Sequence, residues 1–584
     1  MIRLNALKAA TTLRQFAALV DFKPAWLTYI LYVQAPGKKY KTFEIPKKSG
    51  GSRKICAPTE DLKLLQRRLA DLLQDCVDEI KKAQGRHDDG PKPDKIAHGF
   101  RRRRSIVTNA ARHRRRRFVF NVDIADFFGS INFGRVRGFF ISDKNFQLNP
   151  KVATLIAQAA CFENSLPQGS PCSPVISNLI GHVLDVHLAK LAEKTGCIYS
   201  RYADDLTFST NDKNFPASVA VSDGTGSHQW VAGNELAHLI KVSGFSLNPS
   251  KSRMQYRSSR QEVTGLVVNQ VLNVRCEYRR TARAMVHTLL KTGEYYFKRK
   301  HIDKDGNASD ECIVGRSRQL GGVLGFIDQV DQLAAGDTSS KKSEIFRRFL
   351  IFDRFYRSDR TVLVCEGKTD NVYLTHAIRS LATQFPRLAT KYEDGKIDIK
   401  IRRFRYTGRS TNRILGINGG AADLGHFLRL YRAEVERISA PGMQWPVIVL
   451  IDNDSGASPV YSIIRQITGK KPLGDEHYIH VVRNLYVIAT PKLGEAKESK
   501  IEDFFAEEAR SIVLGGKKFN PSNNYDADVE YGKAEFAYKV VEPNAASIDF
   551  SGFQVLLERI SEVIEIHKEK LVPLSPSSAP QLGL

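Results

Sequence analysis

Three carboxylates in the first half of the chain have the types and neighbours that phosphoryl transfer needs. Asp123 lies in the apolar run FVFNVDI, and Asp204 and Asp205 are adjacent in YSRYADDLTFS. Burying such groups is costly unless they are paired or bind a metal, and three of them on neighbouring strands would repel one another. Two Mg²⁺ ions among them could bridge the attacking and leaving oxygens. For an Asp-Asp pair alone, a solvent-exposed turn is the commoner explanation, so its context decides.

A second acidic set lies in the last third of the chain. Glu366 ends the apolar run TVLVCEG, and Asp452 and Asp454 end VIVLIDND. A helical pattern separates the two runs, which predicts a parallel α/β sheet in a separate domain. Functional groups gather beyond the carboxyl ends of such strands, so we expect these acids to meet there and to bind Mg²⁺. Three ordinary acids that cap loops are the alternative.

The elements that must position the first set are predicted from apolar periodicity. Residues 118–124 are almost continuously apolar, which predicts a buried strand. Leucines recur at helical spacing within residues 59–84, which predicts an amphipathic helix. The remaining predictions are helical structure over 1–40, a β-hairpin over 40–57, a helix over 174–195, a hairpin over 198–209, a basic helix over 278–300 and a surface loop over 301–311.

Composition narrows the function classes. The 584 residues carry a formal net charge of +25, which indicates a polyanionic partner, either nucleic acid or an anionic membrane. No apolar run reaches the length of a membrane span, and the N-terminus lacks the apolar core of a secretory signal. The eight cysteines are scattered singly, which predicts reduced, mostly buried thiols in the cytosol and excludes a zinc or disulfide framework.

A dense basic run, RRRRSIVTNAARHRRRR, occupies residues 101–117. Most charge runs are solvated faces, but this one adjoins the strand of Asp123, and guanidinium groups suit phosphates and stacked bases. We therefore expect it to bind RNA. The residues assigned to this contact are Arg101, Arg102, Arg103, Arg104, Asn109, His113, Arg114, Arg115 and Arg116.

The first half resembles reverse transcriptases over about residues 20–340. YADD at 202–205 matches their YxDD box, NVDIADFFGSI resembles their motif A, LPQGSPCSPVISNL their motif B and GFSLNPSKSRM their motif D. TNAARH at 108–113 and VTG at 263–265 match the two signatures of retron reverse transcriptases. A group II intron maturase is the alternative among polymerases, and it is not expected to carry both signatures.

The resemblance implies roles for individual residues. Asp123, Asp204 and Asp205 would hold metal. Phe128 would exclude a ribose 2′-hydroxyl, although a core aromatic is its alternative. Lys251 would protonate pyrophosphate, although a solvated lysine is equally compatible with its position. Lys47 or Lys48 and Arg53 would neutralise triphosphate charge, and Gln168 would line the incoming nucleotide.

The second half resembles the TOPRIM domain of topoisomerases, primases and OLD-type nucleases. GINGGAADL supplies the glycine expected between its two acidic motifs. The resemblance adds Asp370 and Glu502 as metal ligands, Asp503 beside them, and Lys533 as a group that stabilises a pentavalent phosphate, with a surface helix as the alternative for Lys533. No topoisomerase tyrosine can be assigned, which favours a nuclease.

These expectations define a multidomain α+β and α/β chain. We predict fingers and palm over residues 1–270, a thumb and connector over 271–350, a TOPRIM-like nuclease over 355–570 and a disordered tail over 571–584.

The resemblance implies a bacterial, cytoplasmic enzyme that copies a structured noncoding retron RNA into branched msDNA from dNTPs. In this interpretation the nuclease is an antiphage effector that is restrained by that product. The partners would be this RNA, its msDNA and the nuclease's nucleic-acid target, with no membrane and an oligomer possible. Two alternatives are a non-catalytic C-terminal platform and an inactive polymerase that serves as an RNA scaffold.

Overall fold

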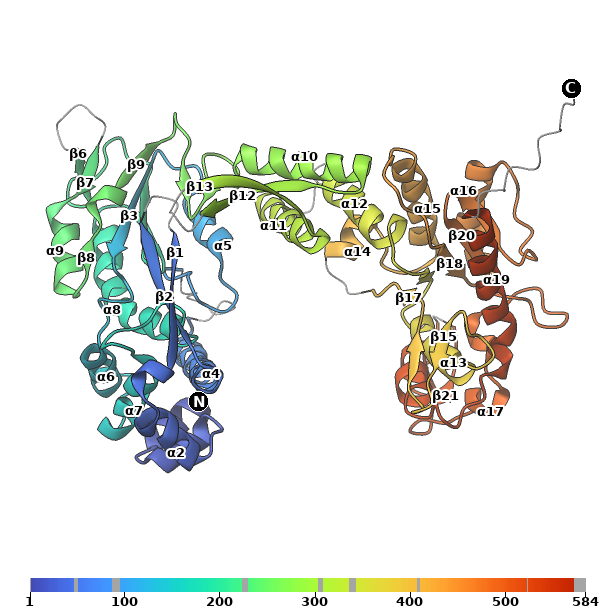
Figure 1. Ribbon diagram of the computed structural model, residues 1–584, viewed down its shortest axis with the longest axis horizontal. Coiled ribbons are helices and arrows are strands. Elements are labelled where there is room, and N and C mark those ends of the chain that lie inside the picture. Colours follow the sequence, from blue (N-terminus) through green and yellow to red (C-terminus); the bar gives the residue numbers. More distant parts are fainter. Residues whose placement is uncertain are drawn as a thin grey trace, which may run out of the picture. The chain divides into compact units, whose positions relative to one another are not determined.

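The computed structural model describes residues 2–46, 51–86, 95–222, 229–302, 308–335, 343–406, 410–522 and 524–571. The chain divides into two compact units, Met1–Cys276 with Val330–Asp337, and Glu277–Gln329 with Thr338–Leu584. Figure 1 shows both units, coloured along the sequence. The predicted tail lies almost entirely outside the described residues.

An antiparallel sheet forms the centre of the N-terminal unit. Its strand order is β4-β5-β3-β8, and β9 also pairs with β3. Figure 1 labels β3, β8 and β9 of this sheet. The near-continuous apolar run of β3 is buried on both faces, as the sequence predicts. The strands are β3 (Phe118–Ala125), β4 (Ile198–Tyr202), β5 (Asp205–Thr210), β8 (Ser246–Leu247) and β9 (Arg253–Tyr256), and small ribbons are formed by β6 (Ala220–Ser222) with β7 (Trp230–Ala232) and by β10 (Glu262–Val263) with β11 (Leu266–Val267).

Helices pack around this sheet in one apolar core. The predicted amphipathic helix is α4, whose leucine face is buried, and the β-hairpin predicted over 40–57 is the antiparallel pair of β1 and β2, called the fingers hairpin below. Both predictions are confirmed. The bounds are α1 (Ile2–Ala9), α2 (Leu13–Leu19), α3 (Pro24–Thr28), β1 (Tyr40–Pro46), β2 (Ser52–Pro58), α4 (Glu60–Ala83), α5 (Ile106–Ala111), α6 (Phe133–Ser142), α7 (Pro150–Ala160), α8 (Ser173–Lys194) and α9 (Asn234–Val242).

Helix α8 confirms the helix predicted over 174–195. Its length and apolar composition also bear on the expectation about membrane-spanning segments. By length and composition alone it could cross a membrane, as could the pair Leu13–Leu19 and Pro24–Val33, which is bent by 104°. The expectation that no apolar segment reaches that length is therefore wrong. Because 56% of the most apolar stretch of α8 is buried inside the protein, it fits the core helix of a globular domain.

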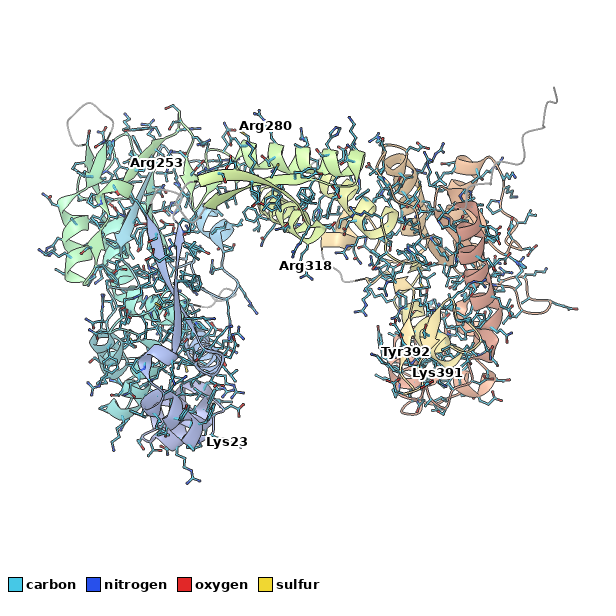
Figure 2. The ribbon with its side chains drawn as sticks, viewed as in Figure 1. Lys23, Arg253, Arg280, Arg318, Lys391 and Tyr392 are labelled. Atoms are coloured by element: carbon cyan, nitrogen blue, oxygen red, sulfur yellow. The ribbon has the colours of Figure 1, made fainter. Side chains whose placement is uncertain are left out.

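The C-terminal unit begins with helices and a long ribbon. Helix α10 (Cys276–Thr292) ends earlier than the basic helix predicted over 278–300, because Tyr296–Ile302 forms β12, which pairs with β13 (Ala308–Val314). The loop predicted over 301–311 is thus mostly part of this hairpin. Aromatic and β-branched residues at both ends of the ribbon favour strand over helix, a signal that the charges between them obscured. Figure 2 shows Arg280 on α10 and Arg318 on α11 (Ser317–Ala335), and both side chains are exposed.

A five-stranded sheet of order β17-β14-β18-β20-β19 forms the core of the rest of this unit. Strands β17, β14, β18 and β20 are parallel and β19 is antiparallel, which confirms the predicted parallel α/β arrangement. The bounds are α11 (Ser317–Ala335), α12 (Glu344–Ile351), β14 (Val362–Cys365), α13 (Asp370–Ser380), β15 (Ala389–Lys391), β16 (Ile397–Ile399), β17 (Arg402–Arg403), α14 (Ser410–Leu415), α15 (Ala421–Val435), β18 (Val447–Ile451), α16 (Ser458–Thr468), β19 (Ile479–Val482), β20 (Leu485–Ala489), α17 (Glu507–Arg510), β21 (Lys518–Phe519), β22 (Glu530–Tyr531), α18 (Lys533–Glu535) and α19 (Gln554–Leu571).

Candidate functional sites

The three palm carboxylates meet where β3 and the β4–β5 turn lie side by side. Asp123 of β3 is the cross-strand partner of Asp205 of β5. The amide of Ile124 donates to the carbonyl of Asp204 at 3.0 Å, which fixes the turn against β3. Ala203 in this turn has φ +57°, a left-handed conformation that a tight reversal requires. The sequence prediction that these acids converge is confirmed.

The electrostatics of this cluster are unfavourable for the acids alone. Burial and the Asp123 carboxylate raise the pKa of Asp204. Although Asp205 is partly open to solvent, desolvation and the carboxylates of Asp204 and Asp123 raise its pKa to about 7. The ammonium of Lys251 lies 2.9 Å from Oδ2 of Asp123, and this hydrogen bond raises the pKa of Lys251, which keeps the lysine charged. A cation added between the acids would therefore be stabilised.

The donor set fits Mg²⁺ by its chemistry, because carboxylate oxygens are the ligands that this ion prefers. In the part of the chain that the structure describes, no three Asp, Glu, His or Cys side chains converge closely enough to hold a metal ion as they stand. At the palm, part of the acidic charge is balanced by Lys251.

Of the predicted nucleotide-binding residues, Arg53 and Lys251 interact with these acids, and Gln168 contacts the β1–β2 hairpin. The positive charge of Arg53 on β2 acts to lower the pKa of Asp204, against the burial that raises it. The carbonyl of Gln168 accepts from the amide of Cys56 at 2.8 Å, so the chain before α8 is tied to β2. Gly169 has φ +122°, and a Cβ there would lie 2.7 Å from the carbonyl oxygen of Cys56, so this close approach needs glycine. Lys47 and Lys48 lie outside the described residues.

Phe128 is half-buried and lies among aromatic rings. Its ring centroid is 5.5 Å from that of Phe127 and 6.1 Å from that of Phe100, which in turn is 6.5 Å from Tyr202 of the YADD turn. This placement at the catalytic turn is compatible with the predicted gate, and the aromatic contacts are compatible with its alternative, a packing role.

A buried ion pair that the sequence analysis did not identify supports the catalytic turn. Arg201 binds Asp185 of α8 with two parallel hydrogen bonds of 2.8 and 2.7 Å, and the two side chains are 0% and 2% exposed. The guanidinium also donates to the carbonyl of Ala203 at 3.2 Å. A Cβ on Gly181 would lie 3.0 Å from the guanidinium carbon, so this helical glycine makes room for it. The sequence signal for this pair was an acid, Asp185, within the apolar part of α8 and a base, Arg201, within the apolar run before the YADD turn.

The Asn-Ala-x-x-His signature is buried, which corrects its predicted direct contact with RNA. Asn109 and His113 are both 0% exposed. The ring nitrogens of His113 lie 2.7 Å from the hydroxyls of Ser209 and Ser200, and Ser200 donates to the Asn109 side-chain carbonyl at 2.7 Å. Since the Ser200 proton is used there, Nε2 of His113 is assigned as the donor to Ser200. The signature therefore ties α5 to β4 and β5, the strands on either side of the YADD turn.

The second signature lies beside the first. The hydroxyl of Thr264, which lies between β10 and β11, donates to the carbonyl of Ile106 in α5 at 3.1 Å. Thr264 and Gly265 both have positive φ, +46° and +79°, as the tight turn between these strands requires. The two signatures, which are far apart in the sequence, thus pack against each other beside the sheet that carries the three acids.

The predicted RNA-binding arginines differ in their surroundings. Arg102 is paired with Asp75 and Asp78 of α4 at 2.8 and 2.9 Å, so much of its charge is already balanced. Arg115 donates to the carbonyl of Gln270. Exposed side chains belong to Arg102, Arg103, Arg114 and Arg115, and half-buried ones to Arg101, Arg104 and Arg116. The exposed members remain the candidates for an RNA contact.

In the C-terminal unit, acids meet at the carboxyl ends of two adjacent parallel strands. Glu366 follows β14 and Asp452 follows β18, and the Asp452 amide donates to the Glu366 carboxylate at 3.2 Å. Asp370, at the start of α13, is 6% exposed and accepts from the Gly367 amide at 2.7 Å. The amide of Gly420, in the predicted glycine loop, donates to the Glu366 carbonyl at 3.0 Å. The predicted meeting of these elements is confirmed.

A lysine lies among these acids. The Lys533 ammonium is 3.0 Å from the Glu502 carboxylate, which is 1% exposed, and 3.9 Å from Asp452. Burial acts to lower the pKa of Lys533, but Glu502 and Asp452 outweigh it and raise this pKa, so Lys533 stays charged. Burial, together with Asp370 and Glu502, raises the pKa of Asp452 to about 8. The arrangement argues against a plain surface helix for Lys533.

The two remaining predicted acids lie at the edge of this group. Asp454 accepts from the Gly456 amide at 2.8 Å, and Lys500 is 3.7 Å from its carboxylate. Its charge contributes to the raised pKa of Glu366, which is due mainly to burial. Asp503 accepts from the Lys500 amide, and the Arg510 guanidinium is 3.8 Å from its carboxylate. Among the described residues, its partners are thus these two and not Lys533.

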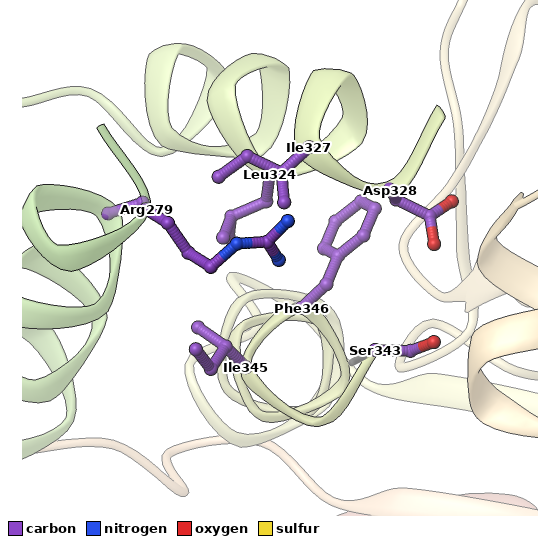
Figure 3. Close-up of a pocket in the computed structure, with 8 residues that line it drawn as sticks. Arg279, Leu324, Ile327, Asp328, Ser343, Ile345 and Phe346 are labelled. Carbon is purple, nitrogen blue, oxygen red and sulfur yellow. The ribbon is translucent and has the colours of Figure 1, made fainter. Parts of the chain in front are cut away.

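A small cavity between α10, α11 and α12 is a packing gap. It has a volume of about 20 Å³ and is lined mainly by apolar side chains such as Leu324, Ile327 and Phe346 (Figure 3). Asp328 at its edge is paired with Arg413. This volume holds about one water molecule, so it offers no substrate site.

Comparisons with known proteins concern the first half of the chain. The reverse transcriptase (RNA-dependent DNA polymerase) family matches residues 45–268. The Retron Mx65 and Mx162 reverse transcriptases of Myxococcus xanthus are 35% and 31% identical over 46% of this chain and 60% and 54% of their own lengths. The Retron Ec86 reverse transcriptase of Escherichia coli is 30% identical over 44% of this chain and 73% of its own. This chain thus spans little more than half the length of the first two relatives.

Among solved structures, a Candida albicans telomerase in complex with a telomeric RNA fragment matches 53% of this chain and 59% of its own at a TM-score of 0.30 and 9% identity. That likeness is too distant to add to the assignment of the fold.

Proposed function

The chain belongs to the family of retron reverse transcriptases, and we propose that it is an RNA-directed DNA polymerase. In this proposal it copies a structured noncoding RNA into branched msDNA from dNTPs. The observation that carries the proposal is the convergence of Asp123, Asp204 and Asp205 at one end of β3 and β5. The presence of both retron signatures, packed together behind these strands, favours a retron enzyme over a group II intron maturase.

The residues around the acids have distinct proposed roles. Bound Mg²⁺ would supply activation of the attacking hydroxyl and neutralisation of the triphosphate. Arg53 approaches from the fingers hairpin and would bind phosphate oxygens, with Lys47 or Lys48 proposed beside it. Lys251, charged and half-exposed, would donate a proton to the leaving pyrophosphate. The retained positive charge of Lys251 supports that role.

The experiment is RNA-templated incorporation of labelled dNTPs by the purified full chain. Asp204→Asn should abolish incorporation. Asp212→Asn is the matched control, because Asp212 is an exposed carboxylate just beyond the opposite end of β5. Incorporation that persists in Asp204→Asn would contradict the proposal, and equal losses in both variants would mean that the effect comes from folding.

We further propose that the C-terminal unit is a TOPRIM-like, Mg²⁺-dependent nuclease. The carrying observation is that Glu366 and Asp452 meet at the carboxyl ends of adjacent parallel strands, with the Lys533 ammonium between Asp452 and Glu502. Asp370, at the start of α13, would complete the acidic group. Mg²⁺ bound by the acids would supply a hydroxide nucleophile. Lys533 would stabilise negative charge on the phosphate, and Asp454 would assist from the edge.

The test of this second activity is cleavage of labelled DNA and RNA by the full chain in Mg²⁺. Glu366→Gln and Lys533→Met should each abolish cleavage, and Asp398→Asn, an exposed acid on β16, should not. If cleavage persisted in Glu366→Gln, the nuclease proposal would fail. Retention of phage protection in Asp452→Ala/Asp454→Ala would favour the alternative, a non-catalytic platform.

The biological role that we propose joins the two activities. The chain would act in the bacterial cytoplasm, where its RNA–DNA product restrains the C-terminal unit until phage infection releases it. This predicts that Asp204→Asn, which makes no product, is toxic when Glu366 is intact. The double variant Asp204→Asn/Glu366→Gln should grow normally, and equal toxicity of the two would contradict the restraint.

A further inference from the structure

A second group of basic side chains lies next to the acids of the C-terminal unit. Arg403 is in β17 and Arg405 follows it, while His376 and Arg379 are in α13, the helix that begins with Asp370. Figure 1 labels both elements. We call these four residues the arginine cluster. None of them belongs to the acidic group, and Arg379 and Arg405 are exposed.

The strand register places Arg405 of this cluster at the acidic edge of the sheet. β17 runs parallel to β14, with Arg403 opposite Leu363, and the amide of Phe404 donates to the carbonyl of Leu363 at 2.8 Å. The hydroxyl of Tyr406 donates to the carbonyl of Cys365, so the chain stays beside β14 to its end. Arg405 is therefore level with Cys365, the residue directly before Glu366.

The arginines also face the helix that carries an acid of the site. Residues opposite each other in neighbouring strands point to the same side of a sheet, so Arg403 and Arg405 share the side of Leu363 and Cys365. That side packs against α13. The Arg403 guanidinium donates to the carbonyl of Asn371, the neighbour of Asp370, at 3.2 Å.

The cluster has an excess of positive charge. Among the described residues, no carboxylate forms an ion pair with Arg379, Arg403 or Arg405, whereas Arg402, on the other side of the strand, is paired with Asp359 at 2.5 Å. Burial and the guanidiniums of Arg405 and Arg379 lower the pKa of Arg403. A polyanion placed across these groups would relieve their repulsion.

The neighbouring acids indicate which polyanion fits. A strand of nucleic acid presents phosphates in a row, so one diester can lie at the acids with Mg²⁺ while its neighbours contact guanidinium groups. We propose that the arginine cluster binds the phosphodiester backbone of a nucleic acid and directs it to Glu366 and Asp452. This inference rests on the proposed nuclease function of the same unit.

The test is photocrosslinking of the full chain to short oligonucleotides that contain 4-thiouridine or 4-thiothymidine. RNA, single-stranded DNA and duplex DNA are compared, and crosslinked peptides are mapped, which separates the C-terminal contact from binding at the palm. In wild type, crosslinks should map to peptides within residues 360–406. Arg403→Gln/Arg405→Gln should lower their yield about tenfold and reduce its salt dependence, because phosphate contacts release counterions.

Controls make the result specific. Arg402→Gln removes an arginine from the opposite side of the same strand and should leave the yield within about twofold of wild type. Arg379→Gln, on an exposed helix position, should lower the yield without altering the sheet. An unchanged yield in both cluster variants, or crosslinks confined to the palm, would overturn the inference.

The same experiment separates this inference from the nuclease proposal. Glu366→Gln should retain the crosslinks and lose cleavage. If wild type cleaves nothing but the crosslinks still depend on Arg403 and Arg405, the binding surface stands and the nuclease proposal fails. The nucleic acid with the highest yield identifies the substrate class.

Discussion

The buried pair of Asp185 and Arg201 gives a sharp prediction about the N-terminal unit. Both side chains are almost fully buried, so Asp185→Asn leaves the Arg201 guanidinium in the core without its counter-charge. Removing one partner of a buried pair costs ~3–5 kcal/mol. Because each ~1.4 kcal/mol is a factor of ten in an equilibrium, opening of the palm should become roughly 100-fold to several thousand-fold more frequent.

Hydrogen exchange measured by mass spectrometry is the suitable assay, because peptides that cover β4 and β5 report on this unit alone. Their protected amides should exchange faster in Asp185→Asn by that factor, and Asp212→Asn should match wild type. Exchange in Asp185→Asn within about threefold of wild type would refute the reasoning, because that factor is worth less than ~1 kcal/mol.

A double variant separates stability from positioning. Asp185→Leu/Arg201→Met replaces the pair by apolar groups, which often restores stability. It should still synthesise DNA poorly, because the hydrogen bond from Arg201 to the carbonyl of Ala203 beside Asp204 is lost. Full DNA synthesis by a stable double variant would show that this bond does not position the catalytic turn.

Three further predictions concern the same unit. Burial lowers the pKa of His98 from 6.5 to about 4, so between these two pH values the unfolded chain binds this proton and the folded chain does not. The free energy of unfolding should therefore fall by ~3 kcal/mol as the pH falls from about 7 to about 4. In urea titrations, His98→Gln should make this pH dependence weaker. Mg²⁺ at ~10 times its Kd should stabilise wild type by ~1.4 kcal/mol, and this gain, measured by exchange of β5 peptides, should be lost in Asp205→Asn; an equal gain in both would place the ion elsewhere. Lys251→Met should lower kcat by ~10²-fold with little change in KM. Lys241→Met, at an exposed position of α9, should change neither kcat nor KM.

Much of the architecture around the acids could be predicted because the signals are local. The apolar run around Asp123, the hairpin around Asp204 and the leucine spacing of α4 each report on a few neighbouring residues. The acids after β14 and β18 were predicted to meet because parallel strands end at one edge of a sheet.

The missed features depend on pairing between distant segments. Nothing in a basic run shows that His113 is buried against Ser200 and Ser209, since burial there is decided by the packing of α5 on the sheet. The location of Arg405 beside Glu366 follows from the register of β17 with β14, which no local pattern encodes. The β12–β13 ribbon was missed because its charged centre resembles a helix face.

The most direct test of the central proposal is to identify the nucleic acid that copurifies with the chain. The protein is purified from cells that carry its neighbouring DNA, as wild type and as Asp204→Asn, and the bound material is sequenced before and after ribonuclease. We predict a branched RNA–DNA molecule in wild type and RNA alone in the variant. RNA alone in both samples would contradict polymerase function and leave the N-terminal unit as an RNA scaffold.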